Sequence, residues 1–501
     1  MRVLLMYPDK DFNLKRELPF NADDLTRDLG LDVIFDHMAK GDGYLYSVVR
    51  NVILNPETDL ETIKYRQEIL KDCMKNQNVV RRLFQIPLEV QENKKKNWWG
   101  VFGWKTPINV LNGSRKALEA MLVALRELKK LADEHRHNFH SRGFTRFFEM
   151  IRTELDEAYL QTVEKHLINL RFSNGMLFKV KLGKGNEGKD YTLCQPDSSR
   201  SILKRLLSVR RMYSYKLHPR DESGARALEK LTNLGLRRVA ATVYYAAEHV
   251  EKFLNKIREE LAFYIGCLNL LEDVEKSKIS FPDPKPIDED DVTAFRGLYD
   301  LSLLLIKRNR VISNDLNTRG KRVFFIMGAN RGGKTTFLRS IGQAQLMMQA
   351  GMFVPASYFE SNVCKGIFTH FKREEDPSLK RGKFEEELVR MNEIVLHLHR
   401  RSMVLFNESF SSTNEMEGSE VAYQIVRALL DSRVKVFYVT HVYELARRFT
   451  GDERVMFLQA ERKPTGERTF KIKEGLPSQT SHAKDIYLKV FRSSTSTSPS
   501  S

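Results

Sequence analysis

The chain has 501 residues, 42% of them hydrophobic and 29% charged, which is enough to bury the cores of roughly two to four water-soluble domains. The formal net charge of +17 favours a polyanionic partner, because lysine and arginine neutralise the phosphates of nucleic acids and lipid surfaces. The short apolar run after Met1 excludes an ordinary signal peptide, and no stretch reaches the roughly 18 apolar residues of a membrane helix.

The four cysteines are far apart in the sequence and form no Cys-x-x-Cys pair. This spacing predicts neither a zinc site nor a disulfide framework, and it indicates buried free thiols in a reducing compartment. We therefore expect a cytoplasmic protein without a membrane partner, and association with the nucleoid is the alternative location.

Residues 1–92 are predicted to form an N-terminal helical core segment, since apolar residues recur three and four positions apart from about residue 22 onward. Residues 93–220 are predicted to form a basic, clamp-like middle region. Helices are expected there at about 113–136 and 143–170. The β-type residues around the Gly-rich turn in GMLFKVKLGKGNEGKDYTL indicate a hairpin.

Two features of the middle region suit nucleic acid. The stretch KKKNWWGVFGWKTP holds all three tryptophans; it suits a base-stacking surface or, with greater weight, aromatic packing at a helix junction. Between residues 179 and 220, eleven lysines and arginines stand against three acids. Such flexible cations suit phosphate contacts, although a solvated basic face has the same composition. The residues predicted to bind DNA are Lys204, Arg205, Arg210 and Arg211.

Residues 221–285 are predicted to form long lever helices. The stretch 221–278 is almost entirely helix-forming, and at about 1.5 Å per residue it would span roughly 85 Å if continuous. The sequence NLG at 233–235 marks a point where the helix could break or bend. A helix of this length can carry motion between distant sites.

From residue 286 to residue 490, apolar strands alternate with amphipathic helices, as in RVFFIM, MVLFNE and VKVFYVTH. This order predicts an α/β domain with a mainly parallel sheet covered on both faces. The expected fold class is a multidomain chain, in which a mainly α-helical core and lever region precedes an α/β P-loop ATPase domain of the ABC type. Residues 491–501 are low in complexity and are expected to form a disordered tail.

The stretch GANRGGKTT follows an apolar strand, opens a helix and fits the nucleotide-loop pattern G-x-x-x-x-G-K-[ST]. Its glycines let backbone N–H groups surround phosphates, Lys334 suits the β- and γ-phosphate oxygens, and the Thr335 hydroxyl suits Mg²⁺. ATP and Mg²⁺ are therefore the predicted cofactors. The predicted nucleotide-binding residues are Gly328, Ala329, Asn330, Arg331, Gly332, Gly333, Lys334, Thr335 and Thr336.

The stretch MVLFNESF at 403–410 predicts the rest of the site. Asn407 stands where an Asp normally supports Mg²⁺; its amide oxygen accepts a hydrogen bond but brings no negative charge, so we expect weaker Mg²⁺ binding and slow hydrolysis. Glu408 is placed to activate the attacking water. His441 ends the next strand and is predicted to contact the γ-phosphate, although alone it would read as a structural histidine.

Three segments, FIMGANRGGKTTFLRSIGQAQLMMQAGMFVPA, MVLFNESFSSTNEMEG and YVTHVYEL, resemble in order the MutS family of DNA mismatch-repair ATPases. The resemblance is specific over about 310–482, and it extends upstream because 221–278 resembles the lever helices of that family. It implies a homodimeric ATPase that binds duplex, mismatched or branched DNA in a clamp.

The chain also departs from the pattern of that family. We expect no N-terminal mismatch-reading domain, for which there is no room before residue 22, and Val311 stands where an aromatic residue packs on adenine. The Ser-Thr signature, with which one subunit caps the γ-phosphate of the other, is replaced by Gly382 and Lys383. Lys383, at a predicted helix N-terminus, is expected to act electrostatically. These departures indicate a divergent branch.

Three functions are compatible with these features. The first is a dimeric ATPase clamp that couples ATP binding and hydrolysis to DNA binding in repair or recombination. The second is a nucleotide-sensing scaffold with negligible turnover, because Asn407 weakens the metal side of the site. The third is an RNA- or ribosome-binding ATPase, since charge alone does not distinguish A-form from B-form duplexes.

Overall fold

A computed structural model describes residues 1–97, 106–173, 175–194, 214–275, 284–307, 311–373, 382–463 and 468–477. The chain forms two compact units. The first contains residues 1–3, 76–140 and 144–261, and the second contains 4–75, 141–143 and the residues from 262 onward. The tryptophan cluster and the predicted tail lie outside the described residues.

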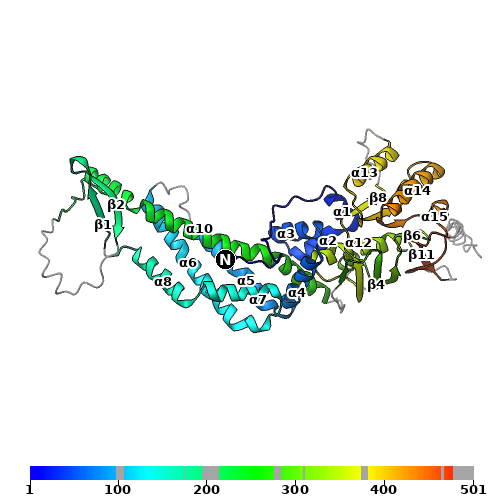
Figure 1. Cartoon of the computed structure of the whole chain (residues 1–501), viewed down its shortest axis with the longest axis horizontal. Helices are drawn as coiled ribbons and strands as arrows, with labels where there is room; N and C mark the ends of the chain where they lie inside the picture. Colours follow the sequence, from blue (N-terminus) through cyan, green and yellow to red (C-terminus); the bar gives the residue numbers. More distant parts are fainter. Residues whose placement is uncertain are drawn as a thin grey trace, which may run out of the picture. The chain divides into compact units, whose positions relative to one another are not determined.

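The first unit is mainly helical, and the hairpin of β1 and β2 belongs to it (Figure 1). Two polar contacts join helix α5 to helix α10, because Gln91 Nε2 donates to Asn255 Oδ1 at 2.5 Å and Lys94 Nζ lies 2.6 Å from Glu251 Oε1. The elements that lie wholly or mostly in this unit are α5 (Gln77–Asn97), α6 (Pro107–His135), η2 (Arg136–Asn138), α7 (Arg142–Glu154), α8 (Glu157–Asn169), β1 (Leu177–Leu182), η3 (Lys184–Asn186), β2 (Gly188–Cys194) and α10 (Glu222–Glu275).

Helix α10 runs without interruption from Glu222 to Glu275, so the NLG sequence does not end it. Gly235 has a packing role instead. A Cβ atom added at Gly235 would lie 2.3 Å from Cε1 of Phe178 in strand β1. The missing side chain therefore lets the antiparallel hairpin of β1 and β2 pack against α10.

The helical segment predicted at 143–170 is two helices, α7 and α8. Asp156 separates them with an extended backbone, and its side chain accepts a hydrogen bond from Tyr159 N at 2.6 Å. This is an N-cap, in which a carboxylate satisfies an N–H group that has no partner within the helix. The continuous apolar pattern across the two helices hid this boundary.

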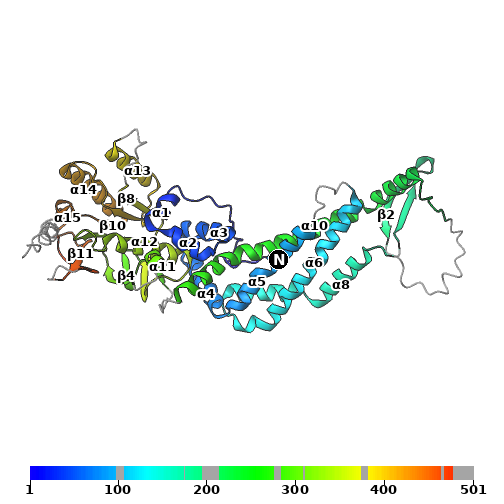
Figure 2. The ribbon, with the colours of Figure 1, turned by 180° about the vertical axis from the view of Figure 1, so that it is seen from behind.

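The second unit contains two sheets with helices around them (Figure 2). The first sheet has the order β12-β11-β6-β10-β9-β8, and the second has the order β3-β7-β4-β5. The elements are α1 (Ala22–Leu29), α2 (Leu31–Ala39), α3 (Gly43–Leu54), α4 (Leu60–Lys75), β3 (Lys285–Ile287), β4 (Val292–Leu298), α11 (Leu301–Lys307), β5 (Asn314–Arg319), β6 (Val323–Met327), α12 (Lys334–Ala350), β7 (Tyr358–Asn362), β8 (Ile367–Phe371), α13 (Lys383–His397), β9 (Met403–Asn407), α14 (Glu415–Asp431), β10 (Lys435–Val439), α15 (Tyr443–Arg447), β11 (Val455–Arg462) and β12 (Arg468–Glu474).

Within the six-stranded sheet, the pairs β11–β6, β6–β10, β10–β9 and β9–β8 are parallel, and β11–β12 is antiparallel. The four-stranded sheet is mixed, since β3–β7 is parallel whereas β4 pairs antiparallel with β5 and β7. Parallel strands end at the same edge of a sheet, where α/β proteins commonly place ligands. The loops after β6, β9 and β10 therefore meet at one edge.

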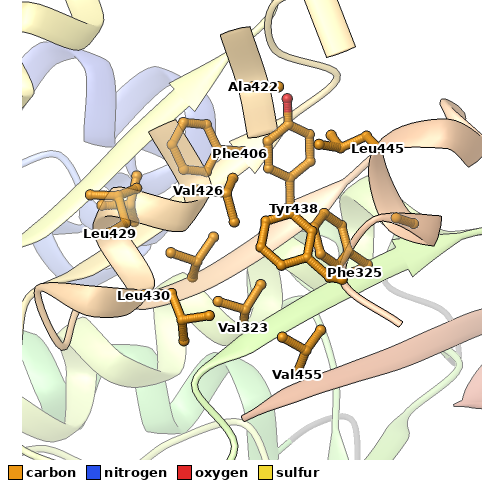
Figure 3. Close-up of a cluster of buried hydrophobic side chains, with 14 of the residues drawn as sticks. Val323, Phe325, Phe406, Ala422, Val426, Leu429, Leu430, Tyr438, Leu445 and Val455 are labelled. Atoms are coloured by element: carbon orange, nitrogen blue, oxygen red, sulfur yellow. The ribbon is translucent and has the colours of Figure 1, made fainter. Parts of the chain in front are cut away.

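The core of this sheet is aromatic and aliphatic (Figure 3). Phe325 of β6, Phe406 of β9 and Tyr438 of β10 pack against aliphatic residues of α14, which covers one face. The buried Tyr438 hydroxyl donates a hydrogen bond to Ser409 O at 2.7 Å. This bond fixes the backbone that follows Glu408, so the core also positions the loop after β9.

The structure divides the chain differently from the boundaries predicted at 92 and 285, because helices α1 to α4 belong to the same compact unit as the sheets. Helix α12 is buried on nearly all sides. A Cβ atom at Gly342 would lie 2.7 Å from both Leu29 of α1 and Leu405 of β9, and Gln343 Nε2 donates to Leu29 O at 2.8 Å. The N-terminal helices thus cover a helix that the sheet alone would leave exposed.

Candidate nucleotide site

The glycine-rich loop connects the buried strand β6 to the first turn of α12. Gly328 and Gly333 have φ angles of 116° and 90°, a region that side chains with a Cβ rarely adopt. A Cβ atom at Gly328 would also lie 2.9 Å from Ala460 Cβ, and one at Gly332 would lie 2.8 Å from Ala329 O. The glycines therefore allow both the path of the loop and its close packing.

Lys334 folds back over this loop. Its Nζ donates hydrogen bonds to Gly328 O at 2.7 Å and to Ala329 O at 3.1 Å. Burial lowers the pKa of Lys334, the nearby Glu408 carboxylate opposes that shift, and Arg468 adds to it. The ammonium group is thus held at the mouth of the loop, where it can reach a phosphate oxygen.

Asn407, which ends β9, contacts the start of α12, and Glu408 and His441 lie near each other. Thr335 Oγ1 donates a hydrogen bond to Asn407 Oδ1 at 3.1 Å, and His441 Nδ1 lies 3.9 Å from Glu408 Oε1. The structure therefore brings together the two predicted metal-side residues and the two predicted catalytic residues.

Glu408 has an unusual backbone. Its φ angle is 53°, which is in the left-handed region, and a residue other than glycine held there costs about 1–3 kcal/mol. Two hydrogen bonds hold this conformation, because Glu408 N donates to Val439 O at 2.9 Å and Ser411 Oγ donates to Glu408 O at 2.7 Å. Backbone strain of this kind is typical of functional sites.

A cavity of about 570 Å³ lies beside the loop, which is within the usual size range of small-molecule sites. Its lining combines the polar groups of Lys334, Thr335 and Glu408 with a mainly apolar part, which is formed by Leu298, Tyr299, Leu303, Val311, Ile312 and Phe470. Polar groups beside a nucleotide loop suit a phosphate chain, and the apolar part of the lining suits a base.

The remaining predicted residues fall into three groups. Asn330, Arg331, Gly332, Gly333 and Thr336 also line the cavity. Gly382 is the N-cap of α13 and Lys383 begins that helix; neither lines this cavity. The predicted DNA-binding residues Lys204, Arg205, Arg210 and Arg211 lie outside the described residues.

The predicted Mg²⁺ fits these residues poorly. Protein sites for Mg²⁺ usually contain one or two carboxylates, whereas Thr335 and Asn407 supply a neutral hydroxyl and a neutral amide. Within the described ranges, no group of three or more His, Cys, Asp or Glu side chains could hold a metal ion. Mg²⁺ therefore stays a prediction.

Sequence reasoning missed Phe470 and Arg468, both from β12. Phe470 belongs to the apolar part of the cavity lining, and its Cβ would lie 3.6 Å from a Cβ atom added at Gly333. No local motif marks these residues, because they come from an edge strand more than 130 positions after the loop. Only the pairing of β12 with β11 beside β6 places them here.

A glycine-rich loop between a buried strand and a helix, with a lysine and a threonine at the helix start, defines the class of P-loop nucleotide-binding proteins. Comparison with known families agrees with this class. Residues 324–490 match MutS domain V, and residues 58–277 match the MutS2 N-terminal domain. The chain belongs to the MutS family, which confirms the resemblance seen in the sequence.

Individual relatives are distant. MutS protein homolog 4 of Mus musculus is 24% identical over 293 residues, which cover 57% of this chain and 29% of that protein. The DNA mismatch repair protein MutS of Clostridium botulinum, strain Hall, is 25% identical over 254 residues, 50% of this chain and 27% of the relative. The chain thus matches less than a third of the length of each.

No helix in the described part of the chain is both long enough and apolar enough to cross a membrane. The four cysteines are free thiols, and burial raises the pKa of Cys73, Cys267 and Cys364. A raised pKa keeps these thiols protonated and unreactive near neutral pH.

Proposed function

We propose that this chain is an ATP-dependent DNA-binding protein that works as a dimeric ATPase clamp in DNA repair or recombination. The observation that carries the proposal is the geometry around Glu408, because a carboxylate follows the strand beside a glycine-rich loop and lies 3.9 Å from His441. The match to MutS domain V supports the same activity.

The proposed roles follow from position. The loop N–H groups and Lys334 bind the phosphates, and the apolar part of the lining, which includes Phe470, receives the base. Glu408 takes a proton from the attacking water, and His441 stabilises charge on the terminal phosphate. Glu408 lines the same cavity as Lys334, and two hydrogen bonds hold its strained backbone.

The DNA contact is proposed for the middle region. Among the described residues there, Lys179, Lys181, Lys184 and Lys189 are exposed on the hairpin of β1 and β2. Exposed lysines on a hairpin suit contacts with phosphates, which position a duplex without reading its sequence. Duplex, mismatched or branched DNA is the proposed partner, and RNA is the alternative that a competition experiment would reveal.

The coupling is proposed to use the long helix α10 as a lever, since it extends from residues of the first unit into residues of the second. A homodimer would place Gly382 and Lys383 at the start of α13 against the nucleotide of the other subunit. ATP then shifts the protein toward the closed state only by binding it more tightly than the open state. A cytoplasmic location is proposed with this function.

ATP hydrolysis by the purified chain, measured with and without branched DNA, tests this proposal. We expect turnover that rises with DNA and disappears in Glu408→Ala. The exposed Glu453, which precedes β11, offers a matched control, because Glu453→Ala removes the same side chain away from the strand ends that form the site. Equal turnover of Glu408→Ala and Glu453→Ala would contradict the assigned role.

Asn407 favours a second candidate, a nucleotide-dependent switch with negligible turnover. The variant Asn407→Asp separates the two. A rise in hydrolysis of about tenfold or more, from almost none, would support the switch, since about 1.4 kcal/mol of barrier corresponds to a tenfold change in rate. Substantial DNA-stimulated turnover of the unaltered chain would instead support the ATPase clamp.

A further inference from the structure

The cavity is lined by charged side chains of both signs. Its lining contains two carboxylates, and each has a basic neighbour, because Asp300 Oδ2 lies 3.4 Å from Arg339 Nε and Glu408 Oε1 lies 3.9 Å from His441 Nδ1. The same lining contains Lys307, Arg331 and Lys334. The lining thus carries three cations and two carboxylates, and one of these carboxylates, Asp300, is paired with an arginine outside the lining.

Arg331 is the distinctive cation of the loop. It is exposed, has a left-handed φ angle of 61° and lines the cavity beside Lys334. Arg468 is close enough for its charge to lower the pKa of Lys334, and it starts the strand that brings Phe470 to the cavity. Among the described ion pairs, none includes Arg331 or Arg468.

Asn407 adds a donor where a carboxylate would add charge. Its Oδ1 already accepts the hydrogen bond from the Thr335 hydroxyl at 3.1 Å. The amide has two further N–H groups on Nδ2, and an amide N–H can donate directly to a phosphate oxygen. An Asp in this place would repel that oxygen unless a cation lay between them.

We propose that this site binds the nucleoside triphosphate without a divalent cation: Arg331 and Lys334 neutralise the phosphates, and the Asn407 amide donates to the terminal phosphate. The inference rests on the proposed nucleotide site and adds the form in which the nucleotide binds. It explains why cations surround a site whose metal-side residues are both neutral.

Equilibrium titration of the full chain with a fluorescent ATP analogue tests the inference, at constant ionic strength and in excess Mg²⁺ or excess EDTA. We expect affinities that differ by less than about threefold between the two conditions, because side chains supply the positive charge. For Asn407→Asp we expect a loss of about tenfold or more in EDTA and little loss in Mg²⁺, since two negative groups then face each other.

Variants of Arg331 test whether its side chain supplies positive charge to the phosphates. In EDTA, Arg331→Gln is expected to bind about tenfold more weakly, and Arg331→Lys to recover most of that loss because it keeps the charge. Arg400→Gln is the matched control, since Arg400 is also exposed and precedes β9 at the end opposite Asn407. Equal affinities of Arg331→Gln and Arg400→Gln would overturn the assigned role of Arg331.

The outcomes separate this inference from the function on which it rests. Binding in Mg²⁺ that weakens about tenfold or more in EDTA overturns metal-free binding and leaves the nucleotide site standing. Absence of binding in both conditions, by a chain that unfolds cooperatively on heating, overturns the nucleotide site itself. Binding in both conditions, with the loss confined to Asn407→Asp in EDTA, supports the inference.

Discussion

Phe470 offers a test of the apolar part of the cavity lining that does not depend on hydrolysis. The residue is 46% exposed and lines the cavity close to Gly333, so part of its ring is available to stack on a base. Stacking of a base on an aromatic side chain contributes about 1–3 kcal/mol. Because the ring is half-exposed, we expect about 1–2 kcal/mol, and Phe470→Ala should bind ATP about 5- to 30-fold more weakly.

The assay compares ATP with inorganic tripolyphosphate as competitors for the same fluorescent nucleotide. Tripolyphosphate has no base, so Phe470→Ala should not change its affinity. Phe20 is a matched control, since it is 47% exposed, does not line the cavity and stacks on His397 with ring centroids 4.0 Å apart. Equal weakening of ATP and tripolyphosphate, or equal effects of Phe20→Ala and Phe470→Ala, would refute stacking by Phe470.

Three further predictions concern the fold and the proposed DNA contact. Gly235→Val should reduce the free energy of unfolding by about 1–3 kcal/mol and so lower the thermal midpoint, because a Cβ atom at this position would lie 2.3 Å from Phe178. An unchanged midpoint would contradict this packing. Burial lowers the pKa of Lys435 from 10.5 to about 8, so the unfolded chain binds more protons between these values. From pH 7 to pH 10, the free energy of unfolding in urea should rise by about 2 kcal/mol more for the unaltered chain than for Lys435→Met. If the free energies of the two chains change in parallel with pH, the lowered pKa of Lys435 is excluded. Replacement of Lys179 and Lys189 by Gln should reduce the slope of log affinity for duplex DNA against log salt by about two, and an unchanged slope would place the phosphate contacts elsewhere.

Local sequence patterns identified the parts of the site that are contiguous in the chain. The glycine loop, Glu408 and His441 each follow an apolar strand and Asn407 ends one, so parallel pairing was enough to bring them to one edge. Phe470 and Arg468 could not be found in this way, because their place depends on how an edge strand pairs. Their positions are a property of the assembled sheet.

In the mainly helical first unit, local sequence patterns also predicted only part of the structure. The length of α10 follows from helix-forming residues, but the NLG sequence was ambiguous because a glycine within a helix either weakens it or permits close packing. The close approach of Phe178 to Gly235 shows that this glycine permits close packing. The boundary at Asp156 depends on one capping hydrogen bond, which apolar periodicity does not report.

The pairing of residues 4–75 with residues from 262 onward has a consequence for how the protein is made. Helices α1 to α4 leave the ribosome long before β6 and α12 are synthesised. The apolar surface with which these helices cover α12 therefore has no α12 to pack against during most of translation. The first unit, whose segments lie mainly between residues 76 and 261, can fold in that interval. We therefore expect a nascent chain in which the middle matures first, and in which the two ends of the chain assemble last.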